Sequence, residues 1–264
     1  MIIDCKQIAR KWKEECTGVH ARLAIVQVGD NPASNAYIKG KIRDCEEVGF
    51  SFSLHRFPED VTEEDLETCI ARLNSDVNVN GIIVQLPLPA HLNADKIVNL
   101  VAIEKDVDGF RVGSPFTPCT PLGVSRLLDE LEISVEDKFV VILGRSEYIG
   151  KKAFDLLLNK NATLAVCHSK TPRSLRDDLL QKADIIISAV GKRDLFSAAD
   201  VKDGAIIIDI GINKKDDGKL CGDFTPDNNR EITYTSVPGG VGLLTRAMLL
   251  QNTLQAYKLQ NSTT

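Results

Sequence analysis

Two features that would point to particular classes of protein are missing from this sequence. No apolar run approaches the roughly 20 residues of a membrane-spanning helix, and no long run of Lys and Arg offsets the net charge of −5. The acidic balance argues against a general nucleic-acid-binding protein. We therefore expect neither a nucleic acid nor a membrane as a partner, and an anionic substrate would need a local basic pocket.

Paired cysteines are missing too. The 7 cysteines are odd in number and scattered, and none forms a C-x-x-C pair. The 4 histidines show no metal-ligand spacing, so we predict no metal site. The opening segment, Met1-Ile-Ile-Asp-Cys-Lys6, carries charge from its fourth residue and does not resemble a signal peptide. These features predict reduced thiols in a cytoplasmic protein.

The hydrophobic pattern predicts an α/β protein. With 264 residues and 43% hydrophobic content, the chain can form one large domain or two modest ones. Predicted strands and helices alternate almost throughout, which is typical of parallel sheets. In the second half, continuous apolar runs indicate strands covered on both faces, at residues 139–143, 162–166, 184–188 and 205–209. In the first half, strands are predicted at residues 21–29, 52–57 and 81–86.

A Pro-rich segment, residues 113–121, separates the two halves. Thr120 is predicted to cap, and Pro121 to open, the helix that follows. The last helical pattern can pack back onto the first half, which makes the first domain discontinuous. We therefore expect two domains: residues 1–118 completed by the C-terminal helix at 243–264, and residues 119–242.

One predicted helix carries a polar face. The segment Pro32–Lys41 follows a predicted strand and turn, and it places Ser34, Tyr37 and Lys41 at i, i+3 and i+7. In a helix these side chains share one face. Lysine acts as a general acid or base when its surroundings lower its pKa. On this segment alone we favour the plainer interpretation, an ordinary amphipathic helix with its lysine in water.

The strand at 139–143 runs into the loop Gly144–Gly150 and then into a predicted helix. A Rossmann-type fold places its phosphate-binding turn at this position. Gly144 permits a tight turn, and Gly150 lets the helix approach the sheet, so that backbone N–H groups can hold a pyrophosphate. The loop lacks the G-x-G-x-x-G pattern, and a glycine after a strand is most often only a turn.

The end of the next strand favours NADP over NAD. NAD-binding folds place an Asp or Glu roughly 20 residues beyond the loop, against the ribose hydroxyls. Here the strand ends in Cys167-His-Ser-Lys170, without a carboxylate. A hydroxyl and cations accept a 2′-phosphate, and Arg145 can supply a forked, charge-assisted contact. For Lys170, a solvated cationic strand end remains the alternative.

Taken together, several segments resemble the bifunctional methylenetetrahydrofolate dehydrogenase/cyclohydrolase family. They occur in the family's order and cover nearly the whole chain: Val28–Lys41, Gly81–Pro89, Lys105–Gly109, Pro118–Gly123, Gly144–Ser146, Asn161–Thr163, Cys167–Thr171, Gly211–Asn213 and Val237–Gly242. The resemblance implies a Rossmann-type, doubly wound NADP-binding domain and an α/β catalytic domain completed by the C-terminal helix. It implies oxidation of 5,10-methylenetetrahydrofolate with NADP, then hydrolysis of the methenyl product to 10-formyltetrahydrofolate.

The resemblance also implies roles for four residues. Lys41 matches the family's catalytic lysine, a general acid/base in the hydrolysis, and Gln85 matches the glutamine that orients it. Tyr37 matches the residue that stacks on the aminobenzoyl ring, and Asp108 matches the carboxylate that binds pterin N–H groups. Without the resemblance, Tyr37 would be interpreted as a half-buried tyrosine, Asp108 as a turn aspartate and Gln85 as a strand-end glutamine.

Other matched positions are expected to line the binding sites. The predicted substrate-binding residues also include Ser34, Pro238, Gly239 and Gly240. The predicted cofactor-binding residues are Gly144, Arg145, Ser146, Ser169 and Ile212. The resemblance further implies tetrahydrofolate one-carbon derivatives as substrates and a homodimer formed through the cofactor domain.

The sequence departs from the family between Asp108 and Pro118, where the link is markedly shorter than usual. This departure concerns the pterin end of the pocket. Two other functions stay open: a dehydrogenase that lacks the hydrolytic step or uses NAD, and a non-catalytic nucleotide-binding regulator. A regulator would not need Lys41, Gln85 and Asp108 together, so we favour the enzyme.

Overall fold

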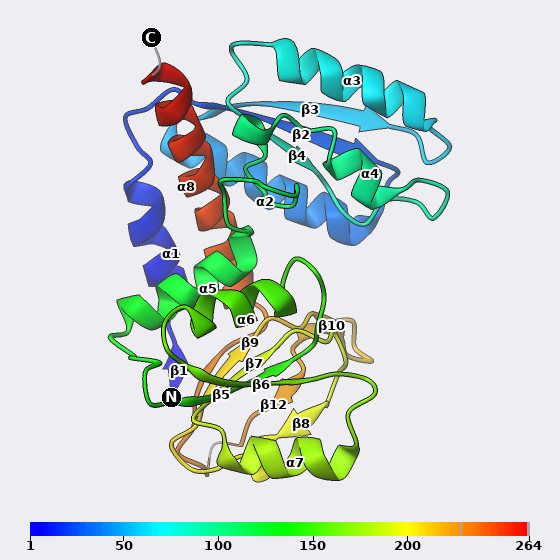
Figure 1. Ribbon diagram of the computed structural model, residues 1–264. Coiled ribbons are helices and arrows are strands. Elements are labelled where there is room, and N and C mark those ends of the chain that lie inside the picture. Colours follow the sequence, from blue (N-terminus) through cyan, green and yellow to red (C-terminus); the bar gives the residue numbers. More distant parts are fainter. Residues whose placement is uncertain (228, 263–264) are drawn as a thin grey trace. The chain divides into compact units, whose positions relative to one another are not determined.

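The computed structural model describes residues 1–227 and 229–262 (Figure 1). The chain divides into two compact units. Unit 1 contains Met1–Arg10 and Thr120–Thr245, and unit 2 contains Lys11–Cys119 and Arg246–Thr264. Each unit is built on a parallel sheet, which confirms the predicted α/β class.

Unit 1 is built around a sheet with the strand order β1-β13-β9-β7-β5-β6. Its strands are β1 (Ile2–Ile3), β5 (Phe139–Leu143), β6 (Thr163–Cys167), β7 (Ile185–Ser188), β9 (Ile206–Asp209) and β13 (Thr233–Thr235). Because β6 and β7 lie on opposite sides of β5, right-handed crossovers place their connecting helices on opposite faces. Figure 1 shows this doubly wound arrangement, with α5 (Cys119–Glu130) and α6 (Gly150–Leu158) on one face and α7 (Arg173–Lys182) on the other.

Short elements decorate the carboxyl edge and one flank of this sheet. They are β8 (Phe196–Ser197), η2 (Ala198–Asp200), β10 (Asn213–Lys214), β11 (Leu220–Cys221) and β12 (Phe224–Thr225). Strands β10 and β11 form an antiparallel hairpin, and β12 pairs with β8 in parallel. The β10–β11 hairpin begins at Asn213, shortly after β9 ends at Asp209.

The amino terminus belongs to unit 1, which corrects the expected first domain of residues 1–118. Ile2 and Ile3 pair in parallel with Tyr234 and Thr235 of β13 and so extend the sheet. Helix α1 (Cys5–Glu14) follows. A strand of two residues carries no readable periodicity, so the sequence analysis had no signal for it.

Helix α5 also begins earlier than predicted. Cys119 is its first residue, so Thr120 lies inside the helix and does not cap it. The hydroxyl groups of Thr120 and Thr245 are 3.1 Å apart. Because Thr245 donates its one hydrogen to the carbonyl of Val241, Thr120 is the donor in this pair.

Unit 2 is built around a parallel sheet with the order β3-β2-β4. The strands are β2 (Arg22–Val28), β3 (Ser51–Phe57) and β4 (Gly81–Val84), and the helices are α2 (Pro32–Val48), α3 (Glu63–Ser75), α4 (Ala94–Val98), η1 (Ile103–Lys105) and most of α8 (Val241–Asn261). Figure 1 shows α2 and α3 on opposite faces of this sheet. Val26 pairs with Val84, so β2 and β4 end at the same edge.

Local sequence fixes where α2 begins and ends. The Asn31 side-chain oxygen accepts hydrogen bonds from the N–H groups of Ala33 and Ser34, at 2.9 and 3.2 Å. Pro32 occupies the first turn, where a missing N–H costs nothing. Gly49 ends the helix in the left-handed conformation. The helix therefore starts directly after the turn that follows β2.

Neither a membrane span nor a metal cluster is found in the part of the chain that the structure describes. Within residues 1–227 and 229–262, every helix is too short or too polar to cross a bilayer. The same residues contain no group of three His, Cys, Asp or Glu side chains that could hold a metal ion. The seven cysteines are present as thiols.

A buried lysine closes the end of α3. Lys105 is 5% exposed, and its ammonium donates to the carbonyls of Leu73, Asn74 and Asp76 at 3.2, 2.8 and 2.7 Å. Carbonyls at a helix end lack intrahelical partners, and the helix dipole favours a cation there. Burial lowers the pKa of Lys105. The lysine of the Lys105–Gly109 segment is therefore structural.

Replacing Lys105 by Met should lower the free energy of unfolding by about 3 kcal/mol, because buried carbonyls lose a charged donor. Urea-induced unfolding measures the loss. Lys96→Met is the matched control, since the Lys96 side chain is 49% exposed and its ion pairs with Glu63 and Glu67 lie at the surface. The control should cost less than about 1 kcal/mol. Equal losses in the two variants would contradict the capping role of Lys105.

Candidate functional site

The loop between β5 and α6 has the tight geometry that a phosphate-binding turn needs. Gly144 has a φ of 111°, and a Cβ there would lie 2.6 Å from the carbonyl oxygen of Ala189. A Cβ on Gly150 would lie 2.3 Å from the carbonyl oxygen of Gly144. Only glycine therefore lets α6 begin this close to the sheet. The Ser146 hydroxyl accepts a hydrogen bond from the Gly150 N–H at 3.4 Å and closes the turn.

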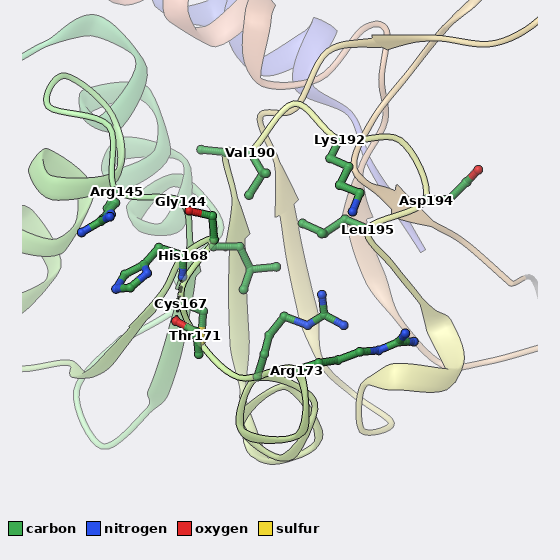
Figure 2. Close-up of a pocket in the computed structure, with 14 residues that line it drawn as sticks. Gly144, Arg145, Cys167, His168, Thr171, Arg173, Val190, Lys192, Asp194 and Leu195 are labelled. Atoms are coloured by element: carbon green, nitrogen blue, oxygen red, sulfur yellow. Dashed lines mark hydrogen bonds between the residues drawn. The ribbon is translucent and has the colours of Figure 1, made fainter.

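A cavity of about 650 Å³ opens beside this loop (Figure 2). Its walls come from the segments that follow β5, β6 and β7, at the carboxyl ends of parallel strands. Doubly wound sheets bind their ligands at this edge. Among the lining residues are Arg145, Ser169, Arg173, Arg176, Val190 and Lys192.

The cavity wall is basic. Cationic side chains come from three segments, and Figure 2 shows Arg145 on one side of the cavity and Lys192 on the other. Arg173 and Arg176 each contact Asp177, at 3.5 and 2.6 Å, which offsets part of their charge. Arg145 is an exposed residue. This is the local basic pocket that an acidic chain needs for an anionic ligand, and its size and charge fit a nucleotide phosphate.

The structure separates the five predicted cofactor residues into two groups. Gly144, Arg145 and Ser169 line the cavity. Ser146 lies in the same loop, where its hydroxyl closes the turn. Ile212 follows β9 and is 59% exposed, beyond the residues that line the cavity.

Lys41 is buried at the carboxyl edge of the unit 2 sheet. It is 6% exposed, and its ammonium donates to the side-chain oxygen of Gln85 at 3.1 Å. The Gln85 amide nitrogen donates to the carbonyl of Leu86 at 2.7 Å, which turns the amide oxygen towards the lysine. The ammonium also lies 5.2 Å from the ring centroid of Tyr37, within range of a cation–π contact.

The predicted polar face of α2 therefore exists, and the plainer interpretation of a lysine in water is wrong. Ser34 and Lys41 are buried, and Tyr37 is half-buried. Gln85 stands directly after β4, so the carboxyl end of this strand meets the polar face of α2. The strand-end position of Gln85 is what brings it to the lysine.

Asp108 lies close enough to Lys41 for their charges to interact. Burial raises the pKa of Asp108, and the charge of Lys41 opposes this with a smaller effect. Cys119 is buried nearby, with its thiol 3.4 Å from the carbonyl of Val107, and burial raises the pKa of that thiol. Cys119 therefore packs beside Val107 as a buried thiol.

The short link after Asp108 folds around a second carboxylate, which the sequence analysis did not single out. Asp106 is buried, and its carboxylate accepts hydrogen bonds from the N–H groups of Phe110 and Arg111 at 3.3 and 2.9 Å. Burial raises the pKa of Asp106 to about 6, although these hydrogen bonds oppose the shift. The link therefore begins in a fixed turn.

Asn252, from α8, holds both ends of the link. Its side-chain amide donates to the carbonyls of Val107 and Thr117, at 2.9 and 3.0 Å. Asp108 lies between these two anchored residues. The shortened link is therefore a compact loop, and the C-terminal helix of the chain fixes the position of Asp108.

Two family models cover most of the chain. The catalytic domain of the tetrahydrofolate dehydrogenase/cyclohydrolase family matches residues 3–108, and the NAD(P)-binding domain of the same family matches residues 118–261. The chain belongs to the tetrahydrofolate dehydrogenase/cyclohydrolase family. This finding confirms the resemblance on which the sequence analysis relied.

Members of the tetrahydrofolate dehydrogenase/cyclohydrolase family align with this chain over nearly its whole length. The bifunctional protein FolD of Polaromonas naphthalenivorans is 45% identical over an alignment of 275 positions, which covers 97% of this chain and 97% of that protein. The FolD structure from Campylobacter jejuni is 41% identical, with a TM-score of 0.93 over 98% of this chain and 99% of that one. The Trypanosoma brucei FolD structure, complexed with NADP cofactor and inhibitor, is 32% identical, with a TM-score of 0.91 over 98% of this chain and 97% of that one.

The predicted folate residues fall into both units of the family fold. Unit 2 carries Ser34, Tyr37, Lys41, Gln85 and Asp108, and unit 1 carries Pro238, Gly239 and Gly240 in the loop before α8. Contacts within unit 2 join Lys41 to Gln85 and Tyr37. Asp106 and Asn252 were not predicted, because their partners lie far away in the sequence or in the backbone. Lys192 and the arginines of α7 were not predicted either, although cations after the strand ends of β6 and β7 are a readable signal.

Replacing Gly109 by Ala should destabilise unit 2 and move Asp108. A Cβ at this position would lie 2.6 Å from the Phe116 carbonyl oxygen, and φ is +70°. Strain and overpacking together should cost about 2–4 kcal/mol, which thermal unfolding measures. Gly113→Ala is the matched control, with a φ of +80° but only a 3.6 Å contact to Ile103. Its cost should stay near about 1 kcal/mol; equal costs would rule out the close approach as the cause.

Proposed function

We infer that this protein carries out two successive steps on a one-carbon unit attached to tetrahydrofolate. It oxidises 5,10-methylenetetrahydrofolate to the methenyl form with NADP, and it hydrolyses the methenyl form to 10-formyltetrahydrofolate. Both family models and the FolD relatives support this function. The observation that carries the hydrolytic step is the 3.1 Å hydrogen bond between buried Lys41 and Gln85.

In this proposal Lys41 moves the proton during hydrolysis. The attacking water must lose a proton and a folate nitrogen must gain one, and a positioned amine can serve both transfers. Gln85 orients the amine through its amide oxygen. Because an amide is neutral, Gln85 positions the lysine through a hydrogen bond and adds no charge beside it.

Other residues of the proposal bind the folate. Tyr37 stacks on the aminobenzoyl ring, a role that its half-buried ring on the polar face of α2 supports. Asp108 accepts hydrogen bonds from pterin N–H groups, supported by a carboxylate held between anchored residues. Ser34 completes the proposed folate contacts of unit 2, and for the Pro238–Gly240 segment of unit 1 a folate contact is what the family resemblance implies.

Residues of unit 1 would hold the cofactor. The loop Gly144–Gly150 would offer backbone N–H groups to the pyrophosphate, and for Ile212, which follows β9, a cofactor contact is what the family resemblance implies. Arg145 and Ser169 bind the 2′-phosphate, supported by their place in the basic cavity. Bound NADP supplies the hydride acceptor. The protein's part in the hydride step is to position the two reactants.

We also propose that the protein is a cytoplasmic homodimer. The seven thiols support a reducing compartment. The edge strand β6 supports self-association of unit 1, because its central residues are apolar and only half-buried. Gel filtration with light scattering would measure the oligomeric state.

Replacing Lys41 by Met should lower the rate of methenyltetrahydrofolate hydrolysis by about 100-fold or more, because the proton carrier is lost. Absorbance of the methenyl form follows the reaction directly. The matched control is Lys39→Met, an exposed lysine on the same helix, which should hydrolyse at the wild-type rate. Hydrolysis at the wild-type rate by the Lys41 variant would contradict the proposed role and favour a dehydrogenase without this second step.

Replacing Arg145 by Ala should raise the KM for NADP by about 10-fold or more and change the KM for NAD little, because only NADP carries the 2′-phosphate. Initial rates of NADPH and NADH formation from methylenetetrahydrofolate measure the effect. Lys170→Ala is the control for a cation at the same strand end. A wild-type preference for NAD would contradict the roles of Arg145 and Ser169.

A further inference from the structure

Asp223 is a buried carboxylate that the proposed reaction does not use. Its side chain is fully buried. One carboxylate oxygen accepts a hydrogen bond from the Ser188 hydroxyl at 2.7 Å. The same oxygen accepts from the N–H groups of Val190 and Gly191, at 2.9 and 3.2 Å. This oxygen therefore gathers the last residue of β7 and the loop that follows it.

The other oxygen of Asp223 reaches two further segments. It accepts from the N–H group of Lys192 at 2.8 Å and from the side-chain amide of Asn213 at 3.0 Å. The backbone carbonyl of Asp223 also accepts from the N–H group of Leu195 at 2.9 Å. One residue thus ties the loop after β7 to the hairpin that follows β9.

The loop after β7 faces the candidate cofactor site. Val190, Lys192 and Leu195 line the 650 Å³ cavity, as Figure 2 shows. Asn213 follows Ile212, one of the predicted cofactor residues. Asp223 therefore lies behind the wall that a dinucleotide would touch. Because Asp223 is fully buried, it cannot touch a ligand in the cavity itself.

The chemistry of the donors requires a carboxylate. Five uncharged N–H and O–H groups converge on two oxygens, and only an ionised Asp or Glu accepts at both. Asparagine would turn an NH₂ group towards donors on one side. The fit is also tight, since a Cβ on Gly211 would lie 2.0 Å from the carboxylate. Asp209 is buried beside it, and burial, with the charge of Asp223 adding to it, raises the pKa of Asp209 to about 6.

We propose that Asp223 is a positioning residue for the nicotinamide cofactor. Asp223 holds the Val190–Lys192 loop and the Ile212–Asn213 segment in the geometry that binds the cofactor. The proposal rests on the proposed function of unit 1 as the NADP site. A positioning residue does not touch the cofactor: Asp223 acts only through the backbone and side chains that it fixes.

The test is Asp223→Asn in the full-length protein. Losing the acceptor for part of this network should raise both the Kd and the KM for NADP by about 10-fold or more. Hydrolysis of methenyltetrahydrofolate, which consumes no NADP, should stay within about twofold of the wild-type rate, since its proposed proton carrier lies elsewhere. Isothermal titration with NADP gives the Kd, and initial rates give the two activities.

Asp217→Asn is the matched control, because Asp217 is an exposed aspartate in the turn of the neighbouring hairpin. It should bind NADP as the wild type does. An Asp223 variant with wild-type NADP affinity would overturn the proposal. A variant that folds but loses both activities in parallel would also overturn it, since that outcome marks a general structural role.

Ser188→Ala keeps the Asp223 carboxylate and removes one of its hydrogen-bond donors. This variant tests the positioning role if the Asp223 variant does not fold. It should weaken NADP binding by about threefold, and unchanged binding would again overturn the proposal. The wild-type protein separates this inference from the proposed function. If it binds NADP while the Ser188 and Asp223 variants bind equally well, only the positioning role fails. If the wild type binds no NADP, the cofactor site itself fails.

Discussion

The hydrogen bond between Lys41 and Gln85 is the interaction on which the candidate catalytic site depends. It exists because two backbone features meet at one sheet edge: α2 starts directly after β2, and Gln85 directly follows β4. The bond from Gln85 to Leu86 then determines which atom of the amide faces the lysine. A buried cation needs such a partner. The amide of Gln85 orients the amine of Lys41 and adds no charge beside it.

The same constraint, that a buried polar group must be paired, shapes the rest of both units. Lys105 closes the end of α3 through three carbonyls. Asp106 and Asn252 turn a shortened link into a loop of fixed shape beside Asp108. In unit 1, Asp223 gathers the loops at the carboxyl edge of the sheet. In each case a buried side chain satisfies backbone groups that would otherwise lie unpaired, and a loop near a candidate site is held as a result.

Sequence patterns predicted the parts of the fold that depend on local periodicity. Apolar runs gave the parallel strands of unit 1, and the spacing of Ser34, Tyr37 and Lys41 gave the polar face of α2. Contacts between distant residues left no such signal. Strand β1 is two residues long, and its partner β13 lies more than two hundred residues away. The contact between Asn252 and Val107 spans 145 residues. The helical segment alone favoured a solvated Lys41, and only the family resemblance indicated its catalytic role, because burial by distant segments has no local pattern.

The ratio of the two activities in Gln85→Leu tests the central claim most directly. Leucine keeps the approximate size of the side chain and removes the oxygen that orients Lys41. Both rates are measured on one preparation, as hydrolysis of methenyltetrahydrofolate and as NADPH formation from methylenetetrahydrofolate. The account predicts that hydrolysis falls by about 100-fold while NADPH formation falls by less than about 10-fold. Hydrolysis at the wild-type rate in this variant would contradict it.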